Sequence, residues 1–303
     1  MVEADAAGIA CAVALLGEGG IVALPTETVY GLAGDATDPA AVAAIYAAKG
    51  RPGYNPLIVH VADLAAAGAL VEIGATARAL AARFWPGPLT LVLPAPPGNG
   101  IVADVTAGLV TLAVRVPLHP VMRAVLTAFG RPLAAPSANA SGTISPTTAA
   151  HVADSLGGRI PLIVDGGATP GGLESSIVRV DGDRVSLLRP GGIPAELLGI
   201  NSETGDGIIA PGQLASHYAP VQPVRLDATS AAPGEFLIGF GAVGGDLTLS
   251  ATGDLAEAAA ALFAALHVAQ ASGATGIAVA PVPASGIGIA INDRLRRAAA
   301  PRR

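Results

Sequence analysis

The chain has 303 residues, of which 51% are apolar, and a formal net charge of −6 at pH 7. Its length and apolar content suffice for two domains with separate cores. The acidic balance argues against stable RNA or DNA binding, because nucleic-acid-binding proteins usually carry a basic surplus or a dense arginine and lysine stripe. Cys11 is the only cysteine. An internal disulfide and a cysteine-based metal cluster are therefore excluded, and a cytoplasmic location is expected.

No window supplies the roughly 18 to 20 uninterrupted apolar residues of a membrane-spanning helix, so no membrane segment is expected. The apolar run at the start of the chain carries Glu3 and Asp5, where a signal peptide needs positive charge. This pattern favours an amphipathic first helix.

The first two thirds of the chain alternate β-branched runs with alanine-rich stretches. The expected helices are 5–16, 39–49, 75–84, 120–129 and 147–156. The expected strands are 21–25, 57–61, 89–93, 110–116, 133–136, 162–165, 176–180 and 185–188. The last two strands flank Asp181-Gly182-Asp183, a turn signal typical of a hairpin. This mixed order predicts an α/β domain with a twisted mixed sheet and packed helices.

A break in the pattern separates this part from the rest of the chain. Residues 201–222 lack periodicity and are rich in Gly, Pro and Ser, as in a linker or a long functional loop. Beyond them we expect strands at 224–226, 236–240, 247–249 and 276–282 and helices at 254–272 and 286–299. The predicted organisation is a larger domain over 1–203, a linker over 204–222 and a smaller α/β domain over 223–303.

Polar residues follow the first expected strand of the larger domain. Pro25-Thr26-Glu27-Thr28-Val29-Tyr30-Gly31 comes directly after it. Polar side chains in such positions commonly line ligand crevices in α/β sheets. The alternative is an ordinary strand-to-helix turn, in which Thr and Glu serve as caps.

The second candidate segment surrounds Lys49, the only lysine beside sixteen arginines. A lone lysine in so arginine-rich a chain marks a position that needs a compact ammonium rather than a planar guanidinium, or is a chance survival on a surface helix. Lys49 and Arg51 flank a glycine, so both cations can reach phosphate oxygens from one helix end. The alternative is helix termination, with Asp38 as N-cap, Lys49 in the last turn and Gly50 just beyond it.

Two further segments are rich in small residues. Residues 134–142, AAPSANASG, supply hydroxyl and amide donors, or form a turn bonded to its own backbone. Residues 165–176 form a glycine-rich loop that enters a strand, or are a surface loop. The loop lacks the pattern GxxxxGK[ST], and no GxGxxG opens a helix, so the common phosphate-loop folds are disfavoured. No GxSxG elbow is present, and five scattered histidines lack metal-ligand spacing.

Together these segments resemble the YrdC-like family. The resemblance rests on PTETVYGL, KGRP with NPL, PGPLTLVL, PSANASG, and DGG followed by ESSIV, in this order. The later SHYAP and the final PVPASGIGIAINDRLRRAA resemble the longer, two-domain branch of the family. The likeness covers essentially the whole chain. Its KxR and SxN motifs are both intact, as Lys49 with Arg51 and Ser137 with Asn139.

The resemblance implies a reaction of L-threonine, bicarbonate and ATP that yields threonylcarbamoyl-adenylate and pyrophosphate. The product serves the N6-threonylcarbamoyladenosine modification at position 37 of tRNA, through a tRNA threonylcarbamoyl transferase complex. Because the nucleophile belongs to the substrate, the protein supplies charge and positioning rather than a catalytic Ser or Cys. Mg²⁺ is expected with the ATP phosphates, without metal ligands from the protein.

The resemblance also implies residue roles. It assigns catalysis to Lys49 and Arg51. It assigns ATP binding to Arg51, Asn55, Thr111, Ser137, Asn139, Ser145, Arg189 and Tyr218. It assigns threonine binding to Thr28, His60, Arg115, Ser176 and the backbone of Ala135. Arg115 is the expected bidentate clamp on the threonine carboxylate, a geometry that arginine suits.

Some alternatives stay open at this stage. The linker, with His217 and Tyr218, is either a lid that excludes water from the adenylate or a passive tether. A nucleic-acid-binding module, a carbamoyl transfer as in hydrogenase maturation and a sensor of nucleotide or amino acid are the competing functions. The net charge argues against the first, the short chain with one cysteine against the second, and the intact KxR and SxN motifs against the third.

Overall fold

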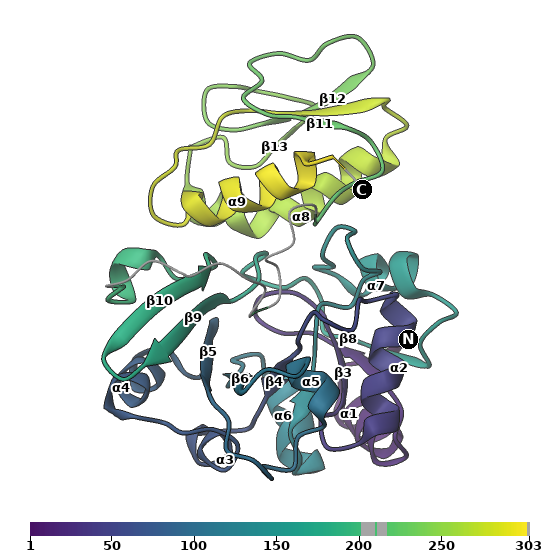
Figure 1. Ribbon diagram of the computed structural model, residues 1–303. Coiled ribbons are helices and arrows are strands. Elements are labelled where there is room, and N and C mark those ends of the chain that lie inside the picture. Colours follow the sequence, from purple (N-terminus) through teal and green to yellow (C-terminus); the bar gives the residue numbers. More distant parts are fainter. Residues whose placement is uncertain (201–209, 211–216, 302–303) are drawn as a thin grey trace.

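The structure is a computed structural model that describes residues 1–200, 210 and 217–301. It has two lobes, the larger built from the N-terminal part of the chain and the smaller from the C-terminal part (Figure 1). The predicted linker 204–222, expected as a lid or a tether, lies mostly outside the described residues. No helix in the described ranges is long and apolar enough to cross a membrane.

The larger lobe is organised around a mixed sheet that has ten strands among the described residues. In spatial order they are β1 (Val2–Glu3), β8 (Leu162–Asp165), β2 (Val22–Leu24), β3 (Gly31–Asp35), β7 (Leu133–Ala134), β4 (Ile58–His60), β6 (Thr111–Arg115), β5 (Leu89–Pro94), β9 (Ser176–Asp181) and β10 (Arg184–Arg189). Strands β4 and β6 are parallel, whereas β7 runs antiparallel to β4. The mixed sheet that the sequence predicts is therefore confirmed.

Helices cover the sheet from both faces. One core layer joins α1 (Ala6–Gly17) and α6 (Pro120–Phe129) to side chains of β2, β7 and β8. A second, larger layer holds α2 (Pro39–Lys49), α4 (Ala75–Phe84) and α7 (Ala149–Leu156) against the opposite face. The short segments α3 (Leu64–Gly68), α5 (Ala103–Thr106) and η1 (Ala195–Leu197) complete the lobe. Alternating side chains of each strand feed the two layers.

The ends of α2 follow from its capping residues, as the sequence predicts. The Asp38 side chain accepts a hydrogen bond from the backbone N–H of Ala40, and Pro39 occupies the first helical position. Gly50 has φ +60°, the left-handed conformation that closes helices and that glycine adopts without strain. This cap places Lys49 in the last turn, from which its side chain enters the protein.

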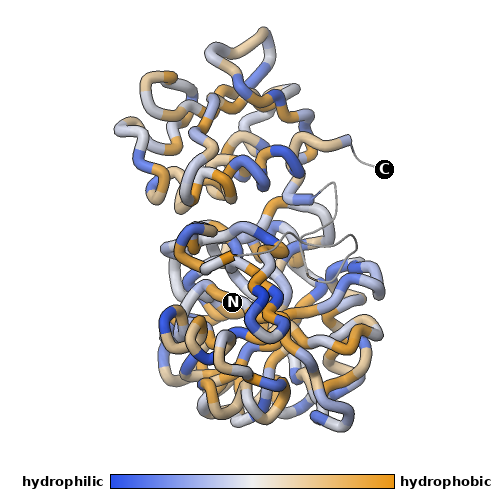
Figure 2. The backbone as a smooth tube through the Cα atoms, turned by 60° about the vertical axis from the view of Figure 1, so that its left-hand side comes forward, coloured by the Kyte–Doolittle hydropathy of each residue, from blue (hydrophilic) through white to orange (hydrophobic). Residues whose placement is uncertain are grey.

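The smaller lobe is a parallel sheet backed by two helices. Its strands are β11 (Val224–Arg225), β14 (Gly276–Val279), β12 (Glu235–Gly239) and β13 (Leu247–Thr248), in spatial order. Helices α8 (Leu255–Ala271) and α9 (Gly288–Ala299) lie between this sheet and the larger lobe (Figure 1). Figure 2 shows hydrophobic stretches in both lobes, consistent with a core in each.

The two lobes meet through close contacts. Leu173 of the larger lobe belongs to the same buried cluster as Phe263 of α8. His151 of α7 stacks on His267 of α8 with ring centroids 3.8 Å apart. Gly172 has φ +66°, and a Cβ there would lie 2.4 Å from two backbone carbonyl oxygens of α8. Only glycine fits this position, because its backbone touches the helix directly.

Several elements differ from the sequence-based expectation. Strands β1 and β3 and the short segments α3, α5 and η1 were not predicted. The segment 25–31 was expected to precede a helix if it had no functional role. It instead turns the chain from β2 into β3, which pairs antiparallel with β2. The Thr26 hydroxyl closes this turn by donating to the Val29 carbonyl at 2.7 Å.

Candidate functional site

A cavity lies over the middle of the larger sheet, beside the parallel strands β4 and β6. It holds about 540 Å³ of empty space when its open mouth is included. Its lining residues come from distant parts of the chain: Thr26, Thr28, Val29, Gly31, Arg51, Ile58, His60, Arg115, Ala135, Pro136, Ser137, Glu174, Ser175, Arg189, His217 and Tyr218.

Strand alternation explains why His60 and Arg115 share the cavity. Their neighbours in the strands, Val59 and Val114, belong to the core layer under the sheet. Adjacent residues of a strand point to opposite faces, so His60 and Arg115 face the cavity. They are also direct partners in the parallel pairing of β4 and β6.

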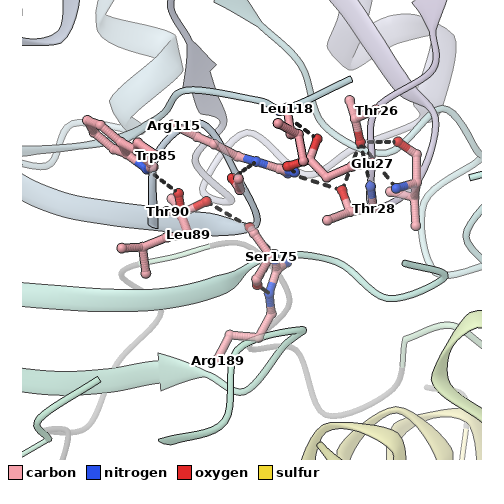
Figure 3. A network of polar contacts seen from close by, with 12 residues as sticks. Thr26, Glu27, Thr28, Trp85, Leu89, Thr90, Arg115, Leu118, Ser175 and Arg189 are labelled. Atoms are coloured by element: carbon pink, nitrogen blue, oxygen red, sulfur yellow. Dashed lines mark hydrogen bonds and ion pairs between the residues drawn. The ribbon is translucent and has the colours of Figure 1, made fainter. Parts of the chain in front are cut away.

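Arg115 is held in place from several sides (Figure 3). Its Nη2 donates to Glu27 Oε1 at 2.6 Å, Nη1 to the Thr28 hydroxyl at 3.1 Å, and Nε to the Gly87 carbonyl at 3.2 Å. Each terminal nitrogen carries two N–H groups and makes one of these bonds, which leaves one donor on each. The pair of donors suits a carboxylate. Burial raises the pKa of Glu27, but Arg115 outweighs it and keeps that pKa below its usual value.

His60 is a neutral imidazole at the floor of the cavity. Burial, reinforced by the positive charge of Arg115, lowers its pKa to about 3. Its Nδ1 is buried without a hydrogen-bond partner. Buried polar atoms in folded proteins are almost always paired, so an unpaired one inside a cavity points to a ligand.

Lys49 reaches the motif around Ser137 from the end of α2. Its Nζ donates to the carbonyl oxygens of Ser137 and Asn139, each at 2.5 Å. The side chain is almost fully buried, and this burial, with the nearby positive charges of Arg51 and Arg159, holds its pKa well below the usual value. The lone lysine and the serine–asparagine turn are therefore neighbours, as the resemblance implies.

Arg51 and Arg189 bring further positive charge to the cavity. Arg51 donates from Nε to the Asn55 carbonyl at 3.0 Å and from Nη2 to the Pro56 carbonyl at 2.8 Å. Burial lowers the pKa of Arg51 to about 10, a value at which it remains cationic near neutral pH. Arg189 donates from Nη2 to the Ser175 carbonyl at 2.9 Å (Figure 3).

His217 and Tyr218 close the cavity on the side of the smaller lobe. Tyr218 is almost fully buried and has φ +61°, a strained conformation for a residue with a bulky side chain. Its ring packs against that of Phe263 at 5.5 Å. Burial lowers the pKa of His217, and the positive charges of Arg51 and other cations lower it further. The positive charges around the cavity thus favour the neutral form of His217.

Other predicted residues lie around the cavity rather than in its wall. Both side-chain polar atoms of Asn55, and Oδ1 of Asn139, are buried without a partner. The Ser145 hydroxyl donates to Glu174 Oε1 at 2.5 Å, and the Ser176 hydroxyl exchanges hydrogen bonds with the backbone of Ile193. These two hydroxyls therefore hold Glu174 and the backbone of Ile193 in place next to the cavity.

Thr111 stands apart from the other predicted residues. It begins β6, four residues before Arg115, which corresponds to roughly 13 Å along a strand. It does not line the cavity formed by the described residues. The roles assigned to all these residues remain predictions.

The sequence reasoning missed the acidic members of the site. Glu27 stands within the quoted PTETVYGL and Glu174 within ESSIV, yet neither was assigned a role. Each pairs with an arginine far away in the chain, Arg115 and Arg294 respectively. A carboxylate's distant partner leaves no local pattern in sequence.

The mixed α/β sheet, with a cavity surrounded by buried cations, defines an α/β protein of the YrdC type. Residues 14–191 match the Sua5, YciO and YrdC family, described as "Telomere recombination". Residues 193–300 match the family described as "Threonylcarbamoyl-AMP synthase, C-terminal domain". The chain belongs to the two-domain threonylcarbamoyl-AMP synthase family, which confirms the resemblance seen in the sequence.

Related sequences and solved structures are similar to this chain over nearly its full length. The threonylcarbamoyl-AMP synthase of Bacillus subtilis is 42% identical, over 96% of this chain and 92% of the relative. That of Pyrococcus abyssi is 39% identical, over 96% of this chain and 93% of the relative. The crystal structure of P. abyssi Sua5 complexed with L-threonine has a TM-score of 0.88 and 38% identity, covering 96% of this chain and 94% of that one.

Proposed function

We propose that this chain is an L-threonylcarbamoyladenylate synthase, a nucleotidyltransferase that uses L-threonine, bicarbonate and ATP. The amine of threonine takes up bicarbonate with loss of water, and forms a carbamate. A carbamate oxygen attacks the α-phosphorus of ATP, and the bond from that phosphorus to the β-phosphate bridging oxygen breaks. Pyrophosphate leaves with the electron pair, and threonylcarbamoyl-adenylate remains.

One observation carries this proposal: the imbalance of charge around the cavity. Arg51, Arg115 and Arg189 line it, with Lys49 directly behind Ser137. Among the described lining residues the one carboxylate is Glu174, which is paired with Arg294. Glu27, outside the lining, is paired with Arg115 of the wall. The excess of positive charge suits a triphosphate beside a carboxylate, and preorganised cations stabilise the charge that develops on oxygen during transfer.

We assign the threonine to the end of the cavity around Arg115. The two remaining N–H donors of Arg115 form a bidentate clamp for the threonine carboxylate. Thr28, His60 and the backbone of Ala135 line the same end, and Ser176 lies behind it. The unpartnered Nδ1 of His60 supports a role in binding the amino acid.

We assign the nucleotide to the opposite end, with Arg51, Ser137, Arg189 and Tyr218 in the wall and Asn55, Asn139, Ser145 and Thr111 as the remaining predicted contacts. Lys49 and Arg51 are the proposed catalytic residues, because they approach the phosphates and the carbamate. Mg²⁺ arrives as part of the ATP substrate. Since Glu174 in the cavity wall and Glu27 behind Arg115 are both ion-paired, Mg²⁺ would be held by phosphate oxygens.

The remaining assignments are of the same standing. We propose domain boundaries at 1–203, 204–222 and 223–303; the separate sheets of the two lobes support them. We also propose a cytoplasmic location, and transfer of the product to a tRNA threonylcarbamoyl transferase complex without stable binding of nucleic acid.

Threonine-dependent release of pyrophosphate tests the function directly. With ATP, bicarbonate and Mg²⁺ we expect release that requires threonine and is slower with serine. Lys49→Ala and Arg115→Ala should abolish it, and Arg179→Ala, at an exposed arginine of β9, should not. Equal release with and without threonine would falsify the assignment.

A further inference from the structure

Helix α9 of the smaller lobe sends one charged side chain into the interface between the lobes. Arg294 is 0% exposed. Its Nε donates to Glu174 Oε2 at 2.8 Å, and its Nη1 to Asp293 Oδ2 at 2.7 Å. Glu174 belongs to the larger lobe and lines the cavity. An ion pair therefore connects the smaller lobe to the wall of the active site.

Glu174 passes this contact on to the nucleotide end. Its second carboxylate oxygen accepts the hydroxyl of Ser145 at 2.5 Å. The next residue, Ser175, accepts two hydrogen bonds from Arg189 through its carbonyl and one through its hydroxyl. Ser145 and Arg189 are both assigned to ATP above. The buried guanidinium of Arg294 thus orients Glu174, which accepts the hydrogen bond of Ser145. Glu174 is also the chain neighbour of Ser175, which binds Arg189.

A second contact reaches the same end of the cavity through Tyr218. The guanidinium carbon of Arg294 lies 5.1 Å from the centre of the Tyr218 ring, within cation–π range. That ring also lines the cavity. Nη2 of Arg294 is buried without a hydrogen-bond partner. A side chain placed only to tie the lobes together would not leave a buried donor unpaired, because such a donor destabilises the folded state.

The charge of Arg294 matters to the cavity as well as its shape. Burial raises the pKa of Glu174, but Arg294 and Arg189 outweigh it, so the carboxylate stays ionised. Without Arg294, Glu174 would lose its direct ion-pair partner, and it would either face the phosphates of ATP as a carboxylate or take up a proton. Repulsion in the first case, and loss of the geometry around Ser145 in the second, would both weaken nucleotide binding.

The structure assigns Arg294 as a positioning residue for the nucleotide: the C-terminal lobe, through Glu174 and Tyr218, completes the ATP end of a cavity built otherwise by the larger lobe. This assignment rests on the proposed function. It is distinct from an ion pair that merely joins the lobes. The threonine end, held by Arg115, Glu27 and Thr28, has no contact with Arg294 among the described hydrogen bonds and ion pairs.

Binding measurements on the full chain test the assignment, with Arg294→Met as the main variant. Calorimetric titration with a non-hydrolysable ATP analogue should show about tenfold or greater weakening. Titration with L-threonine should change less than about twofold. Arg296→Met, an exposed arginine two residues further along α9, is the matched control and should leave both affinities unchanged.

The outcomes separate this inference from the proposed function. Equal affinities for the ATP analogue in wild type and Arg294→Met, or equal loss for ATP and threonine, would refute the positioning role. If Arg294→Met does not fold, Arg294→Lys carries the test, because it keeps the charge but cannot bind two carboxylates in fork geometry. It should still weaken ATP binding several-fold and leave threonine binding unchanged. Failure of threonine-dependent pyrophosphate release in the wild type would instead remove the proposed function.

Discussion

The two ends of the cavity treat buried positive charge in opposite ways. At one end Arg115 faces Glu27 and is held by three hydrogen bonds, so its charge is balanced within the protein. At the other end Lys49 is bound by two backbone carbonyls, and Arg51 likewise contacts carbonyl oxygens. No carboxylate pairs with either of these two cations in the described structure.

The difference indicates which kind of ligand each end of the cavity suits. A balanced end is preorganised for a small zwitterion, which brings a positive and a negative group together. An unbalanced end needs an anion to become neutral, and a polyphosphate supplies it. Buried cations without acidic partners lower the stability of the protein without ligand, and a bound anion would offset this cost.

The largest expected effect is at Lys49, the ammonium at the end of the cavity where the cations have no carboxylate partner. Lys49→Met should lower kcat/KM for ATP about 10² to 10³-fold, because a preorganised charge near the transferring phosphate is lost. Lys49→Arg should be nearly as impaired, since a planar guanidinium cannot fit between the carbonyls of Ser137 and Asn139. Steady-state kinetics checks both, with Arg78→Lys at an exposed position of α4 as control. Full activity of Lys49→Arg would contradict the requirement for a compact cation.

A smaller effect is expected at the balanced end. Arg115→Lys keeps the charge opposite Glu27 but loses the bidentate fork. The KM for threonine should rise about 10 to 100-fold, and the KM for ATP should stay within about threefold of wild type. Arg179→Lys, an exposed substitution on β9, is the matched control. A parallel rise of both constants would show that the two ends are not independent.

The smallest expected effect is the pH dependence caused by His60. Its pKa falls from 6.5 to about 3 in the folded protein, so between these values the unfolded chain binds more protons than the folded one. Stability is therefore lost as the pH falls through this window, by about 1 kcal/mol at pH 5.5 from this group. Thermal unfolding from pH 7 to 4 should show a shallower slope for His60→Asn. Identical slopes would mean that folding does not lower the pKa of His60.

The elements with strong local signals were predictable from sequence. Helix α2 has both of its caps written in the chain, at Asp38 and Gly50, and its observed bounds agree with the prediction. Strand β3, by contrast, reads Gly-Leu-Ala-Gly-Asp and contains no β-branched or aromatic residue. It is a strand because β2 and β7 pair with it on both sides, a tertiary effect that overrides local propensity.

The site divides in the same way. The motifs placed Lys49 and Ser137 in one site, because each lies in a compact motif of the chain. Arg115 lies outside these motifs, and its place in the site was implied by the family resemblance. The partners of the arginines could not be found in this manner. Glu174 and Arg294 are separated by 120 positions in the chain, and only the packing of the lobes makes them neighbours.

The direct seating of Gly172 on α8 has a consequence for exchange of parts between related proteins. A C-terminal lobe from another source must present an equally bare stretch of helix backbone at Ala259 and Ala260, since even a methyl group at position 172 would be 2.4 Å from their carbonyl oxygens. Chimeras that ignore this fit would wedge the lobes apart at the loop that carries Glu174. Compatible halves have to be chosen as a matched set.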